Sequence, residues 1–440
     1  MLEYVWYVNV EVTGYKGRAY SLLKERGVVL GAEVLVRVNG GEYRGIIMPR
    51  YELADDEHIV IKLRNGYNIG LHIDNIIDII GMEGARDITS THTGLKRQDD
   101  SKEKPRIALI STGGTIASRI DYRTGGVRAA LSADELYTMV PELNDIASID
   151  TYPLMQEYSE NITHRHWSMI AEDVKEKIEQ GYDGVVVAHG TDTMHYTSAA
   201  LSFALQNLPV PVVLVGSQRS SDRPSSDASL NLLGSVLFAS YADAAGVFVS
   251  MHAESSDDRI ALHIGTKVRK NHTSSRDAFE SIDTTPIAYV DVDSKSIDMR
   301  VRVPRRDKSR RVECRSRFDD KTALLKFYPN FDPAIIEYLV SNGYRGLVIE
   351  GTGLGHVGSY CFDALRRAID SGMLVYMTSQ CIWGRLRMSV YSTGRDLLNI
   401  GVVPLNMLSE VAYVKLSWAL ANFADEARSI MLKDTAMEFK

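Results

Sequence analysis

Three polar clusters in the chain combine residue types that could perform nucleophilic catalysis. They read STGGTIAS (111–118), AHGTDTMHYT (188–197) and TKVRKNHTSSRDAF (266–279), and each follows an apolar, β-prone run. The hydroxyl of a threonine is a poor nucleophile at neutral pH and needs a neighbouring base and a fixed orientation. A lysine beside such hydroxyls can act as the base if loss of solvent lowers its pKa. The clusters could therefore carry chemistry in which a lysine acts as a base beside hydroxyl groups.

Each cluster also has a purely structural interpretation. The first could be an ordinary turn between a strand and a helix, in which paired glycines permit a sharp bend. In the second, Asp192 or Thr193 could cap the helix that begins there, and such a cap is compatible with catalysis because helix N-termini attract anions. A lysine in a charged loop, such as Lys270, is usually solvated. Three residues of the second cluster are expected to be ordinary helix residues: His195, Tyr196 and Thr197.

From residue 106 onward, strand-like and helix-like segments alternate. RIALIS (106–111), DGVVVAH (183–189) and PVVLVGS (211–217) are apolar, β-branched runs, and helices are expected near 193–206 and 227–240. Buried strands that alternate with amphipathic helices predict a parallel sheet covered on both faces. Open α/β sheets bind their ligands beyond the carboxyl ends of the strands, which is where the polar clusters lie.

A second, smaller α/β domain is predicted toward the C-terminus. GLVIEGTG (346–353) and LVYMTS (374–379) resume the strand pattern, and EVAYVKLSWALANF (410–423) has helical spacing and is expected to pack on this domain. The body of the chain then divides into a domain with the main catalytic candidates, a basic connection and the smaller domain: 105–300, 301–322 and 323–440.

Residues 1–82 predict a small SH3-like β-barrel that precedes this α/β body. Short β-prone runs separated by tight turns indicate such a barrel, and the Asn39-Gly40-Gly41 sequence is a strong hairpin signal. The polar, aperiodic residues 83–104 are interpreted as an exposed linker. The runs in the barrel are AEVLVRV (32–38), EYRGIIM (42–48), HIVIKL (58–63) and YNIGLHI (67–73).

Composition and charge restrict the class of protein. The 440 residues suggest two or three domains, and 45% hydrophobic and 24% charged residues are ordinary for a globular protein. A net charge of −7 argues against binding of nucleic acid over the whole surface. Cys314, Cys361 and Cys381 are widely spaced, which fits a reducing cytosol without a disulfide framework. The first residues do not resemble a signal peptide and no apolar run is long enough to span a bilayer, so a cytoplasmic protein without membrane contact is expected.

Other motifs give weaker signals. GTGLGHVG (351–358) matches the dinucleotide fingerprint formally, but the expected acidic residue about 20 positions on is missing. His164 and His166 are interpreted as surface histidines because their spacing does not suit a helical metal pair, and no metal site is predicted. Between Arg300 and Arg317 there are nine Arg or Lys residues and two acidic ones. This run could be a solvated connection between domains or a contact for a polyanion such as tRNA.

TGGTI (112–116) and HGTDT (189–193), with a lysine downstream, resemble the type I/II L-asparaginase and glutaminase family. The resemblance implies deamidation of glutamine or asparagine through an acyl-enzyme, on a two-domain asparaginase-like α/β fold. Glu160 stands where many asparaginases have glutamine, and it could hold the substrate's α-ammonium beside Asp192. The implied roles are as follows: principal nucleophile Thr115, its flexible-loop partner Tyr122, the second catalytic group Thr191, Asp192 and Lys270, the α-carboxylate ligand Ser159, and oxyanion donors near Gly114 and Gly190.

Further stretches resemble one branch of this family, the glutamine-hydrolysing D subunits of archaeal-type glutamyl-tRNA(Gln) amidotransferases. They include DYRTGGV (121–127), IEGTGLGHV (349–357) and SQCIWGRLRMSVYSTGR (379–395), and an N-terminal barrel is also typical of that branch. The resemblance implies a homodimer in an α2β2 complex with an E-type partner subunit, which binds Glu-tRNA(Gln), ATP and Mg²⁺, whereas this chain needs no cofactor. Two alternatives stay open: a stand-alone cytoplasmic L-asparaginase/glutaminase, and an inactive RNA-binding scaffold.

Overall fold

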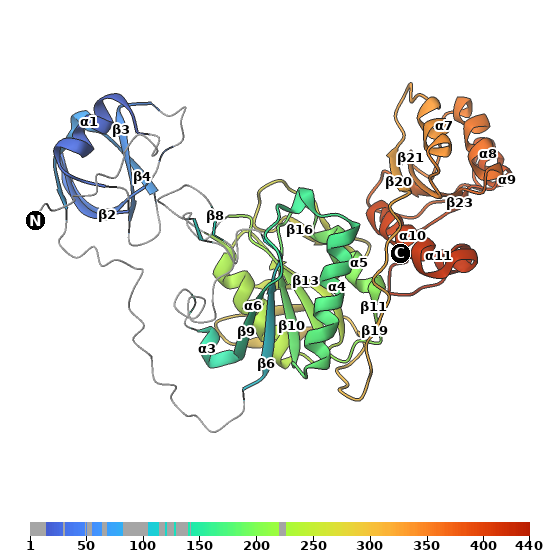
Figure 1. The fold of residues 1–440 in the computed structure, drawn as a ribbon, viewed down its shortest axis with the longest axis horizontal. Helices are drawn as coiled ribbons and strands as arrows, with labels where there is room; N and C mark the ends of the chain where they lie inside the picture. The colour runs from blue at the N-terminus through green and yellow to red at the C-terminus, as the bar shows by residue number, and fades with distance from the viewer. Residues whose placement is uncertain are drawn as a thin grey trace, which may run out of the picture. The chain divides into compact units, whose positions relative to one another are not determined.

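The fold is described from a computed structural model (Figure 1). Its contacts divide the chain into two compact units, which we describe separately. One unit holds the N-terminal β domain and the paired strands β7 (Arg119–Ile120) and β8 (Val127–Arg128); the other holds the α/β body from Lys104 onward. The structure describes residues 15–29, 31–48, 50, 55–63, 68–81, 104–113, 119–120, 127–128, 140, 142–219 and 226–440.

The N-terminal domain is a five-stranded antiparallel sheet, which confirms the predicted small β domain. Its strand order is β4-β3-β2-β1-β5, and the helix α1 (Gly17–Glu25), which the sequence patterns did not indicate, precedes it. β1 and β2 join at Asn39-Gly40, where Gly40 has φ +105, a left-handed conformation that glycine adopts without steric cost. Predicted linker residues 83–103 lie outside the described residues. The strands are β1 (Glu33–Val38), β2 (Gly41–Ile47), β3 (His58–Leu63), β4 (Asn68–His72) and β5 (Ile76–Gly81).

The larger part of the body is built on an eight-stranded sheet of order β18-β17-β14-β13-β12-β10-β6-β9. Five neighbouring strands, from β9 to β13, are parallel as predicted, whereas β14, β17 and β18 extend the sheet antiparallel. The sheet is mixed because the connection from β13 to β14 is too short for a crossover helix. The strands are β6 (Arg106–Ser111), β9 (Ser148–Pro153), β10 (Gly184–Ala188), β12 (Pro211–Val215), β13 (Gly246–His252), β14 (Ile260–Ile264), β17 (Ala288–Asp291) and β18 (Ser296–Met299).

Helices cover both faces of this sheet (Figure 1). Val186 of β10 packs in the core beneath α6, whereas its neighbours Val185 and Val187 pack in the core beneath α4 and α5. A strand buried on both faces has no polar side, which explains the uninterrupted apolar run in the sequence. The observed helices are α3 (Leu143–Ile146), α4 (His164–Glu179), α5 (Met194–Ala204) and α6 (Ala228–Tyr241).

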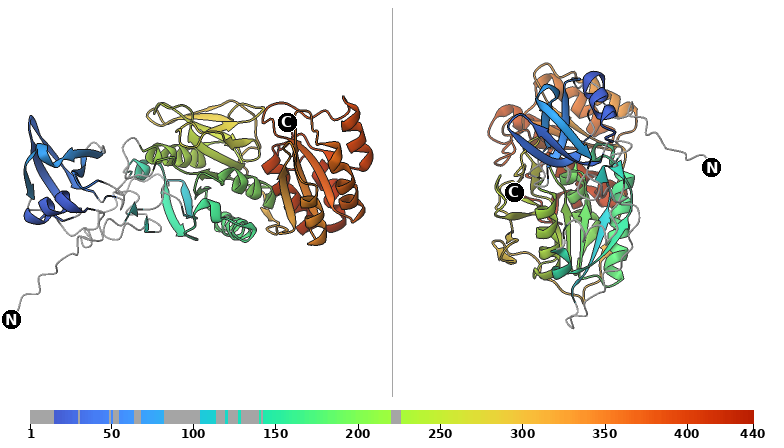
Figure 2. Two further views of the ribbon diagram at one scale, coloured as in Figure 1. Left: turned by 90° about the horizontal axis from the view of Figure 1, so that it is seen from above. Right: turned by 90° about the vertical axis from the view of Figure 1, so that its left-hand side faces the viewer.

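The C-terminal domain is a four-stranded parallel sheet with helices packed around it (Figure 2, orange to red). α10 (Ser409–Phe423) packs on this sheet, as predicted, but it also packs on α5 of the larger domain. Trp418 of α10 stacks on Phe203 of α5 with ring centroids 5.7 Å apart. The remaining elements are β20 (Thr322–Lys326), β21 (Gly346–Gly351), β22 (Leu374–Ser379), β23 (Val403–Pro404), α7 (Ala334–Ser341), α8 (Phe362–Asp370), α9 (Ser392–Ile400) and α11 (Ala427–Leu432).

The basic connection between the two domains is largely built into the fold. The Arg306 guanidinium donates to the carbonyl oxygens of Asp183, Ala239 and Ala242, and Lys308 forms an ion pair with Asp183. β19 (Glu313–Cys314) pairs with β11 (Leu205–Gln206). These contacts give part of the basic run a structural role. Other residues of the run are exposed, among them Arg311, Arg315 and Arg317.

The end of the chain folds back onto α10 through a buried charge. The ammonium of Lys415 pairs with the Glu438 carboxylate, and neither side chain is exposed to solvent. Lys415 Nζ also donates to the Met431 carbonyl at 3.3 Å, and the backbone N–H of Ala436 donates to Glu438 Oε2 at 2.7 Å. The charges of Lys415 and Glu438 therefore have their partners only while the C-terminal segment is packed against α10.

We expect Glu438→Gln to lower the free energy of unfolding by about 3 kcal/mol, because it leaves the Lys415 ammonium buried without its counter-charge. Denaturant-induced unfolding of the full chain measures this value. The exposed Glu426→Gln serves as the control and should differ from the parent by less than about 0.5 kcal/mol. Equal unfolding curves for the two variants would contradict the assignment.

Candidate active site

The structure brings Thr191, Asp192 and Lys270 into direct contact. Thr191 and Asp192 follow the carboxyl end of β10, and Lys270 ends β15 (Val268–Lys270). Lys270 Nζ lies 2.9 Å from Thr191 Oγ1 and 2.7 Å from Asp192 Oδ1. The Lys270 side chain is only 9% exposed and that of Asp192 is 68% exposed. One buried amino group therefore orients a hydroxyl and a carboxylate that remains open to solvent.

The expected helix cap is absent from this loop. α5 begins at Met194 after Thr193, and neither Asp192 nor Thr193 caps it with a side chain. The Thr193 hydroxyl instead donates to the Ser159 carbonyl at 2.6 Å, while Asp192 accepts from Lys270. The capping interpretation was therefore wrong, because both side chains have stronger partners elsewhere.

Ser159 packs directly against the loop. It begins the short 3-10 helix η3 (Ser159–Asn161) and is 5% exposed. A Cβ added at Gly190 would lie 2.8 Å from Ser159 Cβ and 3.0 Å from its Oγ, so only glycine allows this approach. Glu160 is exposed. Ser159 and Gly190 thus lie beside Thr191, whereas Glu160 faces solvent.

The first cluster begins beside the same loop. Both the backbone N–H and the hydroxyl of Thr112 donate to the Ala188 carbonyl at 3.0 Å. Gly113 has φ +116, and a Cβ there would lie 2.3 Å from the Glu157 carbonyl oxygen. The structure therefore places the start of TGGTI beside HGTDT. Three predicted residues of this part of the site lie outside the described residues: Gly114, Thr115 and Tyr122.

A buried chain of hydrogen bonds ends at the Gly190 carbonyl oxygen. The sequence analysis did not predict this chain. Trp167 Nε1 donates to Thr197 Oγ1 at 3.1 Å, and that hydroxyl lies 2.9 Å from His189 Nε2. His189 Nδ1 lies 2.7 Å from the Gly190 carbonyl oxygen, to which it donates. Burial lowers the pKa of His189 to about 4. The neutral ring accepts from Thr197 and fixes the backbone that leads to Thr191, so Thr197 is more than an ordinary helix residue.

His195, the second residue of α5, is also neutral near pH 7. Burial, helped by the positive charges of Arg269 and Lys270, lowers the pKa of His195 to about 3. Its Nδ1 is buried without a hydrogen-bond partner among the described residues. His195 therefore adds no charge to the site.

Other candidate sites offer less. No cluster of three His, Cys, Asp or Glu residues that could hold a metal ion occurs within the described ranges. His166 caps α4 by accepting from the Thr163 N–H at 3.0 Å, and His164 Nε2 lies 2.8 Å from the Tyr413 hydroxyl. Both histidines are half-buried rather than the predicted surface residues. A cavity of about 330 Å³ lies at the amino end of β13, away from Thr191.

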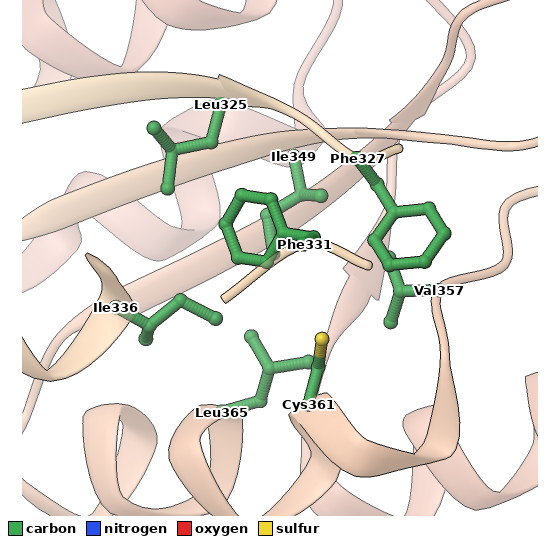
Figure 3. Close-up of a pocket in the computed structure, with 8 residues that line it drawn as sticks. All are labelled: Leu325, Phe327, Phe331, Ile336, Ile349, Val357, Cys361 and Leu365. Atoms are coloured by element: carbon green, nitrogen blue, oxygen red, sulfur yellow. The ribbon is translucent and has the colours of Figure 1, made fainter. Parts of the chain in front are cut away.

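A small apolar cavity of about 10 Å³ lies in the C-terminal domain (Figure 3). Figure 3 shows the Cys361 thiol as the one heteroatom among the side chains that it labels, and burial raises the pKa of this thiol to about 11. Such a cavity can hold about one water molecule but offers it no polar side-chain partner other than a thiol. It is a packing gap lined by Leu325, Phe327, Phe331, Ile336, Ile349, Val357, Cys361 and Leu365.

Comparison with protein families matches nearly the whole chain in three parts. Residues 106–304 match the asparaginase N-terminal model and residues 321–430 the glutaminase/asparaginase C-terminal domain. Residues 29–80 match the GatD N-terminal domain.

Two similar proteins show to which branch of the asparaginase-like proteins the chain belongs. The chain is 48% identical to the D subunit of the glutamyl-tRNA(Gln) amidotransferase from Pyrococcus furiosus over 428 residues, which cover 96% of this chain and 97% of that one. The corresponding D subunit from Thermococcus kodakarensis is 49% identical over 432 residues, with 96% and 97% covered. The chain belongs to the D-subunit family of glutamyl-tRNA(Gln) amidotransferases. This confirms the resemblance drawn from the sequence motifs.

Solved structures show that this chain has an asparaginase-like fold. The thermostable L-asparaginase from Thermococcus kodakarensis superimposes with a TM-score of 0.68 at 31% identity, and the match covers 76% of this chain and 99% of that one. L-asparaginase I from Vibrio cholerae gives a TM-score of 0.66 at 25% identity, with 77% and 99% covered. The asparaginase-like fold class is therefore confirmed.

Gly190→Ala should lower amide hydrolysis by about 100-fold, because the new methyl group forces Ser159 or the Thr191 loop to move. The rate of glutamine hydrolysis and the melting temperature are both measured. Gly41→Ala, where a Cβ meets nothing within 4 Å, is the matched control. An active Gly190→Ala variant would show that the close packing is not needed.

Acid should destabilise the fold before most carboxylates titrate. The unfolded chain binds a proton at each histidine near pH 6.5, whereas His189 binds one only near pH 4, so the unfolded state holds more protons between these values. The stability is complete above about pH 6.5 and is lost as the pH falls toward 4. Unfolding free energies at pH 7.5 and pH 5 measure the loss. His189→Gln should make this dependence shallower, and an unchanged slope would contradict the assignment.

Proposed function

We propose that this chain is the glutaminase subunit of a tRNA-dependent amidotransferase. It hydrolyses glutamine, or asparagine, and supplies the ammonia to a partner subunit that converts Glu-tRNA(Gln) to Gln-tRNA(Gln) with ATP. The observation that carries the proposal is the contact of Lys270 Nζ with Thr191 Oγ1 and Asp192 Oδ1, at 2.9 and 2.7 Å, in a chain of the D-subunit family.

The proposed reaction runs through a threonine ester. The Thr115 hydroxyl attacks the side-chain amide carbon, and its proton passes through Tyr122 to the amide nitrogen, which leaves as ammonia when the ester forms. Water then attacks the ester carbon, the acid is released and the Thr115 hydroxyl is restored. Lys270 donates to the Thr191 oxygen and orients its hydroxyl, which takes a proton from the attacking water while its own proton passes to the Thr115 oxygen as the ester C–O bond breaks. Backbone N–H groups near Gly114 and Gly190 stabilise the oxyanion.

Substrate binding is assigned to the remaining side chains of the site. Ser159 binds the α-carboxylate of the amino acid. The exposed carboxylate of Asp192 binds the α-ammonium of the amino acid. Lys270 contacts only Oδ1 of this carboxylate, so Oδ2 stays available for the substrate. The exposed Glu160 lies next to Ser159 in the chain and adds a second negative charge for the ammonium.

The partner completes the reaction in this proposal. An E-type subunit binds Glu-tRNA(Gln), ATP and Mg²⁺, and two copies of each subunit form an α2β2 complex around a homodimer of this chain; the chain itself needs no cofactor. The cysteines Cys314, Cys361 and Cys381 are unpaired, which supports a cytoplasmic location. No helix in the described part of the chain is long and apolar enough to cross a membrane.

A stand-alone L-asparaginase is the second candidate. The similar asparaginase from Thermococcus kodakarensis is covered over 99% of its length, so the α/β body alone corresponds to a complete asparaginase of that kind. The N-terminal domain, which matches the GatD N-terminal model, favours the amidotransferase. Deleting residues 1–82 distinguishes the two, because a stand-alone enzyme should keep its activity and bind no partner.

The decisive experiment co-purifies the chain with its partner subunit and measures glutamine hydrolysis with and without Glu-tRNA(Gln). We expect low activity for the chain alone, since uncoupled hydrolysis wastes glutamine, and a clear rise in the complete complex. Lys270→Met and Thr191→Val should each lower the activated rate by about 100-fold or more, because each removes the proton-transfer group.

The matched control is Lys267→Met, which changes a lysine of the same segment that does not contact Thr191 or Asp192. Full activity of the isolated chain would favour the stand-alone enzyme. An active Thr191→Val variant would reject the assigned chemistry and revive the inactive-scaffold alternative for this group.

A further inference from the structure

The hairpin that carries Lys270 is not part of the main sheet. β15 pairs only with β16 (Phe279–Ser281), antiparallel, as a separate two-stranded sheet among the described strands. Lys270 lies opposite Phe279 in this hairpin. The position of Lys270 therefore depends on what the hairpin contacts, rather than on the hydrogen bonds of the eight-stranded sheet.

Arg269 and Lys270 project to opposite sides of this hairpin, since successive side chains of a strand alternate. Lys270 contacts Thr191 and Asp192 in the larger domain. Arg269 Nη1 lies 2.7 Å from Glu410 Oε1, in the first turn of α10 in the C-terminal domain. Two adjacent residues thus connect the candidate active site to the other domain.

The acidic partner in this pair is unusually buried. Glu410 is 4% exposed, and its second oxygen, Oε2, has no hydrogen-bond partner within the described residues. Burial raises the pKa of Glu410, and the charge of Arg269 opposes this rise; Glu350 and Lys440 also act on it. Because a buried carboxylate needs a counter-charge, Glu410 holds the Arg269 side chain, and with it the strand, in one place.

The same helix also supports the other half of the site. α10 packs on α5, which begins directly after the Thr191 and Asp192 loop. Tyr413 of α10 and Tyr196 of α5 have ring centroids 6.4 Å apart. α10 is therefore a common support for the loop and for the strand whose contact forms the site.

We propose that Arg269 and Glu410 are positioning residues, whose ion pair between the two domains fixes the distance of Lys270 Nζ from Thr191 and Asp192. Through this pair, the C-terminal domain controls whether the proton-transfer group is assembled. The inference rests on the proposed catalytic function of Lys270.

Two other ties between the domains provide a control. The Thr266 hydroxyl donates to the Ala436 carbonyl at 2.8 Å, and Lys440 Nζ lies 3.0 Å from Asp283 Oδ2. These contacts hold the two ends of the hairpin region, whereas Arg269 adjoins Lys270. Thr266→Val removes one of these two ties between the domains and changes no charge near the pair next to the site.

Kinetics of the complete complex test the proposal. Glu410→Gln keeps the size of the side chain and removes its charge; kcat for glutamine should fall about tenfold, since a small displacement of a catalytic group is costly. KM should stay within about twofold, because Lys270 acts on the chemical step. Arg269→Gln should behave likewise, Arg269→Lys should recover most of kcat, and the control Thr266→Val should keep kcat within about twofold.

A single variant leaves one charge of the pair buried without its partner and can fail to fold. The double variant Arg269→Gln/Glu410→Gln removes both charges and therefore tests the proposal in that case. It should melt near the parent temperature and show the same loss of kcat. Unchanged kcat in this variant and in Glu410→Gln, or an equal loss in Thr266→Val, overturns the proposal. An active Lys270→Met variant would reject the proposed catalytic role of Lys270. An inactive Lys270→Met variant together with a fully active Glu410→Gln variant would reject only the positioning role of the Arg269 and Glu410 pair.

Discussion

The parallel pairing of β6 with β10 is the contact on which the candidate site depends. Ser111 lies opposite Ala188 at the carboxyl end of both strands, so the two polar segments that follow leave the sheet at the same level. Thr112 then donates twice to Ala188, which holds the start of one segment against the other. A shift of this register by one residue would turn every side chain to the opposite face and separate the segments.

Much of this arrangement could be predicted because it is local. The β-branched run Val185 to Val187 indicates a buried strand, and polar residues directly after it indicate a ligand edge. The pairing of Lys270 with Thr191 spans distant parts of the chain, and it was predicted from family motifs rather than from any pattern in the residues. The helix cap was predicted wrongly since local preference for a cap at Thr193 competes with a distant acceptor, the Ser159 carbonyl.

Contacts between domains could not be predicted for a related reason. Nothing in the residues near Arg269 indicates a partner in Glu410, although strand alternation alone separates Arg269 from Lys270. The sequence likewise does not indicate that His189 and His195 are neutral, because their lowered pKa values follow from burial in the folded chain. Charges buried at joints seldom add stability compared with apolar residues, but they favour one arrangement of the joined parts.

Helix α5 has no solvent-exposed face, which matters while the protein is being synthesised. Every residue of α5 except Tyr196 is buried, partly by α10 and by the C-terminal segment that follows it. While the chain leaves the ribosome, α5 is made more than two hundred residues before α10. The nascent larger domain therefore exposes an apolar helix next to an unsupported loop until the last helices emerge. A chain that stops before α10 therefore lacks both the helix that packs on α5 and the buried partner of Arg269.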